Sequence, residues 1–421
     1  VSMTVPPAKS PLIRVLLVLG GLTALVTVFY GPAIGHEFVY DDVKVVLQND
    51  KIQTSDGLRR AFTEHYWSFD EDKASGYYRP LSVVWLVGCW ALFGPEPAGW
   101  HVLSILLHAL VSLLVWRLAR SLGLPPTSAV VAAALFAAHP IQIQTVAWVS
   151  AFCDLLLAAA LAASLLLWIE GRKHACRARL VASTVAFGVG LLVLDRAFPY
   201  LLVPFALALF LPRDESATGA KRVVTALRET APLLVPVGIV VLMRLVFVES
   251  LAAPEGGTTA AQILWTSPSM VLRYLSNVIA PVHLSVIYPE GIETAATLRG
   301  VWMPSIAVAA AGFLGLALSI KRPLRLFLGV SFVALASSAL LAPIVLPDNL
   351  VEDRYLYVPG IFGSLWLASF IEVRSPERRG LRVGVAVGLA IWGIFLLAVH
   401  RPNLRPWENS LTLWTRAVEV V

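Results

Sequence analysis

Long apolar runs separated by short basic segments dominate this sequence. The first run covers residues 15–34, and at about 1.5 Å per helical residue it is long enough to cross the roughly 30 Å hydrocarbon core of a bilayer. With 57% hydrophobic and only 14% charged residues, the sequence predicts an all-α polytopic membrane protein of about eleven spans. The other runs lie near residues 100–116, 127–138, 146–169, 180–194, 198–211, 231–249, 301–319, 326–343, 355–371 and 383–399.

The basic residues indicate how these spans are oriented, because Lys and Arg concentrate in cytoplasmic loops. If the short apolar segment 81–93 is an interfacial helix, Arg117 and Arg120 fall on the same side as Lys9 and Arg14. This orientation predicts a cytoplasmic amino terminus and an exocytoplasmic carboxyl terminus. Later basic segments then also fall on the cytoplasmic side, around residues 171–179, 213–228, 321–325 and 374–382. A cleaved signal peptide is the rival interpretation of the first run, which is longer than the usual apolar region of such a peptide.

Two large loops face outward in this topology and divide the predicted membrane domain, residues 1–400. The first large loop covers residues 35–99, and the second covers residues 249–300 with an amphipathic piece at 268–279. Transporters usually bind substrate at the midplane between internal repeats, and no convincing repeat is visible here. A site covered by two outer loops therefore favours a membrane-surface enzyme, with a lipid-linked-sugar flippase as an alternative.

Several function classes lack support in the sequence. The net charge of +6 comes without a basic-aromatic motif for nucleic acid, so no nucleic-acid partner is expected. The three cysteines show neither metal-type spacing nor an even count for a disulfide framework. No Walker-type glycine loop and no Gly-x-Ser-x-Gly motif is present, which argues against an ATP-driven pump and a serine hydrolase.

Asp41 and Asp42 are the most unusual pair in the chain. They follow the first apolar run directly, and adjacent carboxylates beside a membrane helix are costly unless they face water, a cation or a reacting substrate. We interpret Asp41 as a general base, with Asp42 sharing or orienting it. The alternative is that both residues only end a helix and lie in solvent.

If the enzyme transfers a sugar from a phospholipid carrier, the carrier phosphate is the leaving group. Such a reaction needs cations or donors that neutralise the departing phosphate. Arginines in the outer half of the membrane are the candidates, and they are Arg79, Arg196, Arg244, Arg273 and Arg354. Arg354 stands out because Glu352 and Tyr357 accompany it at the start of a span. The alternative for this group is an interfacial salt bridge with an aromatic belt.

Other polar residues near the outer ends of spans complete the candidate set. His139 precedes Pro140 and is expected to be structural or catalytic, while Asp154 and Asp195-Arg196 either line the site or pack helices. His101 and His108 are too far apart on a helix to form an adjacent-turn metal pair, so no metal site is predicted.

With these residues the chain resembles the transmembrane and tetratricopeptide-repeat-containing O-mannosyltransferases and their bacterial relatives, within the glycosyltransferase C superfamily. The resemblance covers nearly the whole chain and implies a GT-C-like helix bundle. It rests on Phe38-Val39-Tyr40-Asp41-Asp42, Tyr78-Arg79-Pro80-Leu81, Gly99-Trp100-His101, Leu107-His108-Ala109, Ala138-His139-Pro140, Val146-Ala147-Trp148-Val149-Ser150, the segment 275–288 and Glu352-Asp353-Arg354-Tyr355-Leu356-Tyr357-Val358-Pro359.

The resemblance implies a membrane glycosyltransferase that takes a sugar, such as mannose, from a polyprenyl-phosphate carrier and inverts the anomeric carbon. The acidic motif in the first large loop would carry the base. Such enzymes commonly work without a tightly bound metal, although metal-using branches exist, so no cofactor is expected. The implied partners are membrane lipid, the lipid-linked sugar and a protein or glycan acceptor, and a bacterial inner membrane is favoured over the endoplasmic reticulum.

Residues 401–421 are similar to the lead-in that precedes tetratricopeptide repeats in these relatives. Because the sequence stops there, either a longer protein or a separate repeat-containing subunit is expected to recognise the acceptor. Two departures from the family pattern weaken the transfer of function: Phe152 stands where relatives have arginine, and Arg196-Ala197 stands where they have Lys-Glu. The second hypothesis is therefore a catalytically inactive scaffold subunit of a larger membrane assembly.

Overall fold

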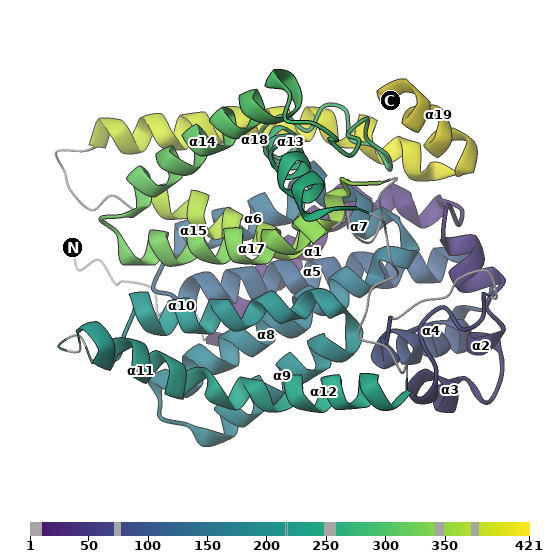
Figure 1. Cartoon of the computed structure of the whole chain (residues 1–421), viewed down its shortest axis with the longest axis horizontal. Helices are drawn as coiled ribbons and strands as arrows, with labels where there is room; N and C mark the ends of the chain where they lie inside the picture. Colours follow the sequence, from purple (N-terminus) through teal and green to yellow (C-terminus); the bar gives the residue numbers. More distant parts are fainter. Residues whose placement is uncertain are drawn as a thin grey trace, which may run out of the picture.

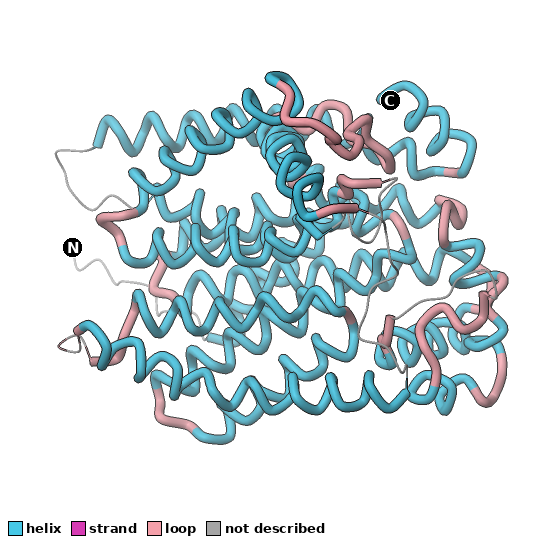
Figure 2. The backbone as a smooth tube through the Cα atoms, in the orientation of Figure 1, coloured by secondary structure: helices cyan, strands magenta, loops and turns pink. Residues whose placement is uncertain are grey.

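The computed structural model describes residues 11–70, 77–214, 216, 218–247, 258–341, 349–371 and 379–421. Lys9, most of the basic segment 374–382 and the start of the second large loop lie outside the described residues. Throughout the described ranges the regular structure is helical and contains no strand (Figure 2). The prediction of an all-α protein is confirmed.

Each predicted apolar run corresponds to a helix of the bundle shown in Figure 1. Within the described residues, seven helices are long and apolar enough to cross a membrane, or eight if the pair Pro126–Ala138 and Pro140–Ala147, bent by 51°, is one span. Shorter helices such as α10 do not meet that length, so the count of eleven spans stays a prediction. The helices are α1 (Pro11–Tyr30), α5 (Pro97–Ser121), α6 (Pro126–Ala138), α8 (Phe152–Lys173), α9 (Arg177–Val193), α10 (Leu202–Phe210), α12 (Leu234–Phe247), α14 (Met303–Ser319), α15 (Pro323–Ala336), α17 (Tyr357–Ala368) and α18 (Arg379–Leu404).

Helix α8 lies at the centre of the bundle. It packs against α9, α5 and α17, and its side chains are buried on most of its circumference. A helix that is apolar all round is stable only when other apolar groups surround it. The outer helices instead expose large apolar side chains, including Leu242 on α12, Phe313 on α14 and Ile391 on α18. So much exposed apolar surface is stable in lipid and not in water, which makes this chain an integral multi-pass membrane protein.

The first large loop folds into short helices at one end of the bundle (Figure 1). These are α2 (Asp50–Gln53), α3 (Gly57–Thr63) and α4 (Pro80–Phe93). The fourteen residues of α4 span about 21 Å, which is less than the hydrocarbon thickness. Ser82 on α4 donates its hydroxyl hydrogen to the carbonyl of Val193 (2.7 Å), so α4 is fastened to the end of α9.

The second large loop carries α13 (Ala260–Ile279), which is longer than the amphipathic piece predicted at 268–279. Thr259 caps its first turn. The Thr259 hydroxyl accepts from the backbone N–H of Gln262, and the Gln262 side-chain oxygen accepts from the backbone N–H of Thr259. Trp392 of α18 donates to the carbonyl of Ile279, so the helix is also held at its carboxyl end.

The carboxyl-terminal segment lies at the same end of the bundle as the first large loop (Figure 1). The backbone N–H of Glu37 donates to the carbonyl of Glu408 (2.9 Å), and helix α19 (Ser410–Val420) follows. From this end, α8 runs through its 22 residues, about 33 Å, to Lys173 at the opposite end. The bundle therefore has two chemically distinct ends.

Candidate functional site

The two adjacent aspartates occupy different environments. Asp42 is fully buried, and it accepts hydrogen bonds from the backbone N–H of Val39 (3.2 Å) and from both the N–H (2.7 Å) and the hydroxyl (2.5 Å) of Ser150. These bonds tie the first large loop to the turn that precedes α8. Burial raises the pKa of Asp42 to about 7. Asp42 is therefore an anchor of the loop and has no open face toward a substrate.

Asp41 is half-buried and follows a strained residue, Tyr40, whose φ of 57° is unusual for a bulky side chain. The Tyr40 ring is held between Trp148 (5.3 Å between centroids) and Trp414 of α19 (5.6 Å). Strain of this kind persists only where the surroundings over-determine the conformation. The packing of Tyr40 thus sets the direction of the backbone that carries Asp41.

Asp41 shares its surroundings with the arginines of the site. Burial raises the pKa of Tyr40 to about 12, and the charges that act on the same phenol are those of Asp41, Glu352 and Arg354. Burial likewise raises the pKa of Tyr66; the charge of Asp41 also raises this pKa, while Arg79 and Arg354 lower it. The Asp41 carboxylate therefore lies near phenols on which Arg354 and Arg79 also act.

Arg354 is the best-anchored of these arginines. Its short helical segment, η9 (Asp353–Leu356), begins just before α17, and its backbone N–H donates to the side chain of Gln144 (2.9 Å). The guanidinium contacts Glu352, lies 3.9 Å from Asp154 and stands over the ring of Trp148 at 4.9 Å. Trp148 therefore connects the Arg354 guanidinium with the loop that carries Asp41.

Asp154, in the first turn of α8, is buried between two arginines. Arg196 donates to one carboxylate oxygen at 2.6 Å, and Arg354 approaches the other. Arg196 also lies over the ring of Tyr355 at 4.3 Å. One carboxylate thus balances two guanidinium groups that come from segments more than 150 residues apart.

Asp195 repeats this arrangement beside it. Arg79 contacts one oxygen at 3.4 Å and Arg244 of α12 contacts the other at 3.1 Å. The Arg79 guanidinium also stands over the rings of Tyr77 (4.3 Å) and Tyr66 (5.5 Å). The four arginines and the three acids Asp154, Asp195 and Glu352 form what we call the arginine cluster. Without Asp41 it carries one net positive charge.

Besides Arg273, which donates to Glu290 (2.6 Å), two other predicted site residues lie outside the arginine cluster. His139 accepts from the backbone N–H of Ile141 (3.1 Å), and its second ring nitrogen faces the carbonyl of Val278 (3.0 Å). The Tyr357 hydroxyl is 2.7 Å from a ring nitrogen of His108 in the buried core. Both side chains have intramolecular partners that account for them, and the structure does not bring either to Asp41.

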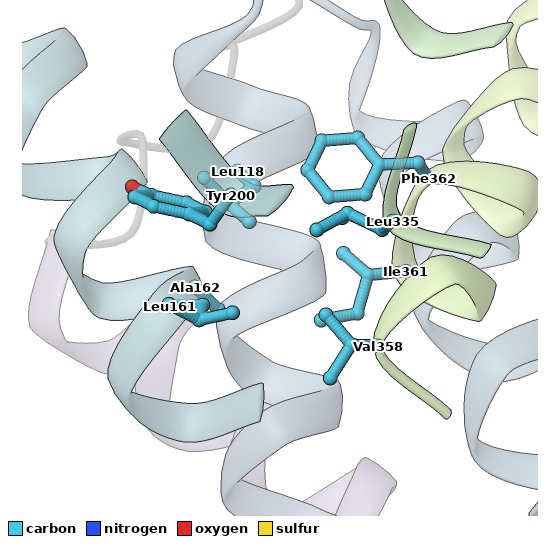
Figure 3. Close-up of a pocket in the computed structure, with 8 residues that line it drawn as sticks. All are labelled: Leu118, Leu161, Ala162, Tyr200, Leu335, Val358, Ile361 and Phe362. Carbon is cyan, nitrogen blue, oxygen red and sulfur yellow. The ribbon is translucent and has the colours of Figure 1, made fainter. Parts of the chain in front are cut away.

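The described residues contain no group of three or more His, Cys, Asp or Glu side chains that could hold a metal ion. The acids of the arginine cluster face guanidinium groups instead. A small cavity lies deeper in the bundle (Figure 3), between Leu118, Leu161, Val358 and Phe362, with the Tyr200 hydroxyl pointing away. Its volume of about 10 Å³ is that of a packing void, and its lining offers no charged group.

Asp195, Trp148 and Ser150 are the residues of this site to which sequence reasoning assigned no definite role. Asp195 was expected either to line the site or to pack helices, and it contacts Arg79 and Arg244. Trp148 and Ser150 belong to the motif Val146-Ala147-Trp148-Val149-Ser150. This motif supported the resemblance to the family, but the sequence assigned it no chemical role. The two departures, Phe152 and Ala197, are both buried in the core.

Comparison with known proteins matches a middle region of the chain that holds part of this site. Residues 78–246 match the family model described as dolichyl-phosphate-mannose-protein mannosyltransferase, a range that includes Arg79, Asp154, Asp195, Arg196 and Arg244. The chain is 34% identical over 158 residues to protein O-mannosyl-transferase Tmtc2 of Drosophila melanogaster, which covers 36% of this chain and 16% of that protein. It is 31% identical over 137 residues to human protein O-mannosyl-transferase TMTC3, and this match covers 32% of this chain and 15% of that protein. The chain therefore corresponds to a small part of these relatives, and the resemblance expected from its motifs is confirmed.

Among solved structures, the chain is similar to the Archaeoglobus fulgidus oligosaccharyltransferase tethered to an acceptor peptide, with a TM-score of 0.50 and 15% identity. The likeness covers 93% of this chain and 55% of that one. At this level of identity the likeness concerns the fold, and it confirms the expected GT-C-like bundle.

Proposed function

We propose that this chain is a membrane glycosyltransferase that moves a sugar from a polyprenyl-phosphate carrier to a hydroxyl of a protein or glycan acceptor. The observation that carries the proposal is the arginine cluster, in which four arginines from four separate segments converge beside the loop of Asp41. The matched family description, which names a dolichyl-phosphate-linked mannose, supports this donor class and favours mannose as the sugar.

In the proposed reaction, the acceptor oxygen attacks the anomeric carbon from the face opposite the phosphate, so the configuration inverts. A new carbon–oxygen bond forms to the acceptor while the bond between the anomeric carbon and the phosphate oxygen breaks. Asp41 takes the proton of the acceptor hydroxyl, and the electron pair leaves with the carrier phosphate. This chemistry routes no step through a metal ion.

The arginine cluster suits the leaving phosphate because pairs of arginines share one carboxylate. Asp154 serves both Arg196 and Arg354, and Asp195 serves Arg79 and Arg244. Each guanidinium has donors beyond those that its carboxylate can accept, and preformed donors stabilise developing charge without reorganisation. In this proposal Arg354 and Arg196 lie closest to the phosphate, while Asp42 positions the loop through Ser150.

We place the reaction on the exocytoplasmic side, because the basic segments between spans mark the opposite end as cytoplasmic. A bacterial inner membrane suits this assignment better than the endoplasmic reticulum. A repeat-containing subunit or segment would present the acceptor near α19, whose Trp414 contacts Tyr40.

The test is sugar transfer by the purified chain in liposomes, with labelled polyprenyl-phosphate mannose and peptide acceptors. Asp41→Asn keeps the shape of the side chain but removes the base, so the transfer rate is expected to fall on the order of 10²- to 10⁴-fold. The matched control is Asp56→Asn, which alters an exposed acid of the same loop that pairs with its neighbour Arg59. This control is expected to transfer at the wild-type rate.

Three results would contradict the proposal in different ways. Equal transfer by wild type and Asp41→Asn would remove Asp41 from the mechanism. Absence of transfer by a wild-type chain that binds the donor would favour the inactive scaffold, the hypothesis that Phe152 and Ala197 motivate. Movement of labelled lipid between leaflets without acceptor glycosylation would favour a flippase.

A further inference from the structure

A second cavity lies at the end of the bundle opposite Asp41, between the carboxyl-terminal ends of α5, α8 and α10. Its volume is about 260 Å³ and it is open on one side. Nineteen residues of α8 separate Asp154 in the arginine cluster from Lys173 at this cavity, a rise of about 28 Å. The two sites therefore lie about one hydrocarbon thickness apart. Its lining residues are Ser121, Leu122, Ile169, Arg172, Lys173, Leu207, Leu211, Pro212 and Arg213.

The polar part of the lining is basic. Arg172 and Arg213 share one carboxylate, that of Glu229, at 2.9 and 3.6 Å. Lys173 donates to the backbone carbonyl of Ser121, which carries no charge. Two acids lie beside these three cations: Glu229 on α11 (Gly219–Thr230), and Glu170 on α8, which accepts from the Ser121 hydroxyl (2.6 Å) and interacts with Lys173. The cavity therefore has an excess of one positive charge.

The remaining lining is apolar, and so is the surface beside it. Leu122, Ile169, Leu207 and Leu211 form one wall. On the neighbouring α11, Val223, Val224 and Leu227 are exposed, while Lys221 and Arg228 accompany them. An amphipathic helix with basic residues beside an apolar face is typical of a segment at a membrane surface.

The guanidinium of Arg172 is held in a fixed position, where it could bind an anion at the level of the lipid headgroups. Its guanidinium stacks on the ring of Trp168 at 4.6 Å, and its side chain is only 9% exposed. Tryptophan commonly lies at the level of lipid headgroups, and a planar guanidinium matches two phosphate oxygens at once. Rigid placement lowers the entropy cost of binding such a group.

We propose that this cavity binds the headgroup of an anionic glycerophospholipid, such as phosphatidylglycerol, from the leaflet opposite the Asp41 site. Arg172, Lys173 and Arg213 contact the phosphodiester, and the leucine wall lies along the upper acyl chain. Basic pockets between membrane helices on the cytoplasmic side are known to hold such headgroups. The polyprenyl-phosphate donor is excluded as occupant by position, because the arginine cluster lies at the other membrane face.

The experiment measures binding of phosphatidylglycerol and phosphatidylcholine to the purified full chain in detergent by native mass spectrometry. The test variant is Lys173→Gln with Arg213→Gln, and the control is Lys221→Gln with Arg228→Gln, which removes the same charge from α11 outside the cavity. We expect wild type to prefer phosphatidylglycerol, and the test variant to lose at least about tenfold in affinity for it. The control variant is expected to keep the preference.

Equal losses in both double variants would show a general surface-charge effect and overturn the proposal. Equal binding of the two lipids by wild type would overturn it as well, and so would displacement of phosphatidylglycerol by millimolar inorganic phosphate, because that would identify a free-anion site. If the double variant does not fold, Arg213→Gln alone serves, since that side chain is 46% exposed. A severalfold loss in that single variant supports the lipid site, and unchanged binding contradicts it.

Discussion

At the scale of single residues, neighbours in sequence differ sharply in environment. Asp41 is half-buried beside a phenol on which Arg354 and Arg79 also act, whereas Asp42 turns inward to Ser150. Asp353 and Arg354 show the same contrast: Asp353 is buried and accepts from Asn277 (2.8 Å) and Tyr288 (2.6 Å). In both pairs the buried aspartate anchors the backbone from which the other residue reaches the site.

Asp353 leads to a prediction about pH and stability. Burial raises the pKa of Asp353 to about 7 from its usual value near 4, so between these values the folded state binds more protons than the unfolded state. The contribution of Asp353 to the free energy of unfolding is therefore highest below about pH 4 and is lost as the pH rises to about 7. Asp42 acts in the same direction.

The difference in thermal denaturation midpoint between wild type and Asp353→Asn is expected to shift in favour of the variant as the pH rises over this range. Asparagine can still accept from Asn277 and can donate to the Tyr288 hydroxyl oxygen, so the variant keeps the shape of the contact. Identical slopes for wild type and variant would contradict this assignment.

At the scale of elements, the first large loop is held by close backbone packing. Gly57 begins α3, and a methyl group there would lie 2.4 Å from the carbonyl oxygen of Lys51 and 3.0 Å from Val87. Lys51 is itself buried, and its ammonium group donates to the carbonyl of His65 (2.8 Å). The loop that carries Asp41 therefore tolerates no side chain at position 57.

Gly57→Ala is expected to destabilise the chain by about 1–3 kcal/mol, because backbone atoms must move to admit the methyl group. Gly88→Ala in the adjacent helix α4 is the matched control, since no atom lies within 4 Å of the added carbon. There alanine is expected to be neutral or to stabilise by up to about 1 kcal/mol, through its higher helix propensity. Thermal unfolding of both variants in detergent tests this contrast, and equal midpoints would contradict it.

At the scale of the whole molecule, the chain separates two kinds of chemistry by about one membrane thickness. The arginine cluster includes Asp154 at the start of α8, and the basic cavity lies at the carboxyl-terminal end of α8. Helices α4 and α19 lie at one end of the bundle (Figure 1). Since basic loop residues mark the cytoplasmic side, Asp50 of the first large loop is expected on the exocytoplasmic side and Lys221 on the cytoplasmic side.

Single cysteines test this topology on a background in which Cys89, Cys153 and Cys176 are replaced by serine. A membrane-impermeant maleimide is expected to label Asp50→Cys in intact cells and Lys221→Cys only after permeabilisation, since both side chains are mostly exposed. Labelling of both in intact cells, or the reverse pattern, would contradict the predicted orientation. Denatured samples control for the reactivity of each thiol.

The sequence by itself determined the helical membrane fold, the positions of the helices and the kinship of its motifs. Apolar runs suffice for this, because the hydrocarbon core requires each span to satisfy its own backbone and to expose apolar side chains. It also pointed to Asp41, Arg79, Asp154, Arg196, Arg244 and Arg354 as candidates, since charges near a membrane helix are rare.

Only the tertiary structure decided which of these residues meet. Arg79 reaches Asp195 across 116 positions, and Asp42 reaches Ser150 across 108. Such contacts depend on how the helices pack, so a local sequence pattern does not predict them. For the same reason the sequence did not show that His139 and Tyr357 lie outside the site. Charge and hydropathy are properties of a residue, whereas the pairing of charges is a property of the packed bundle.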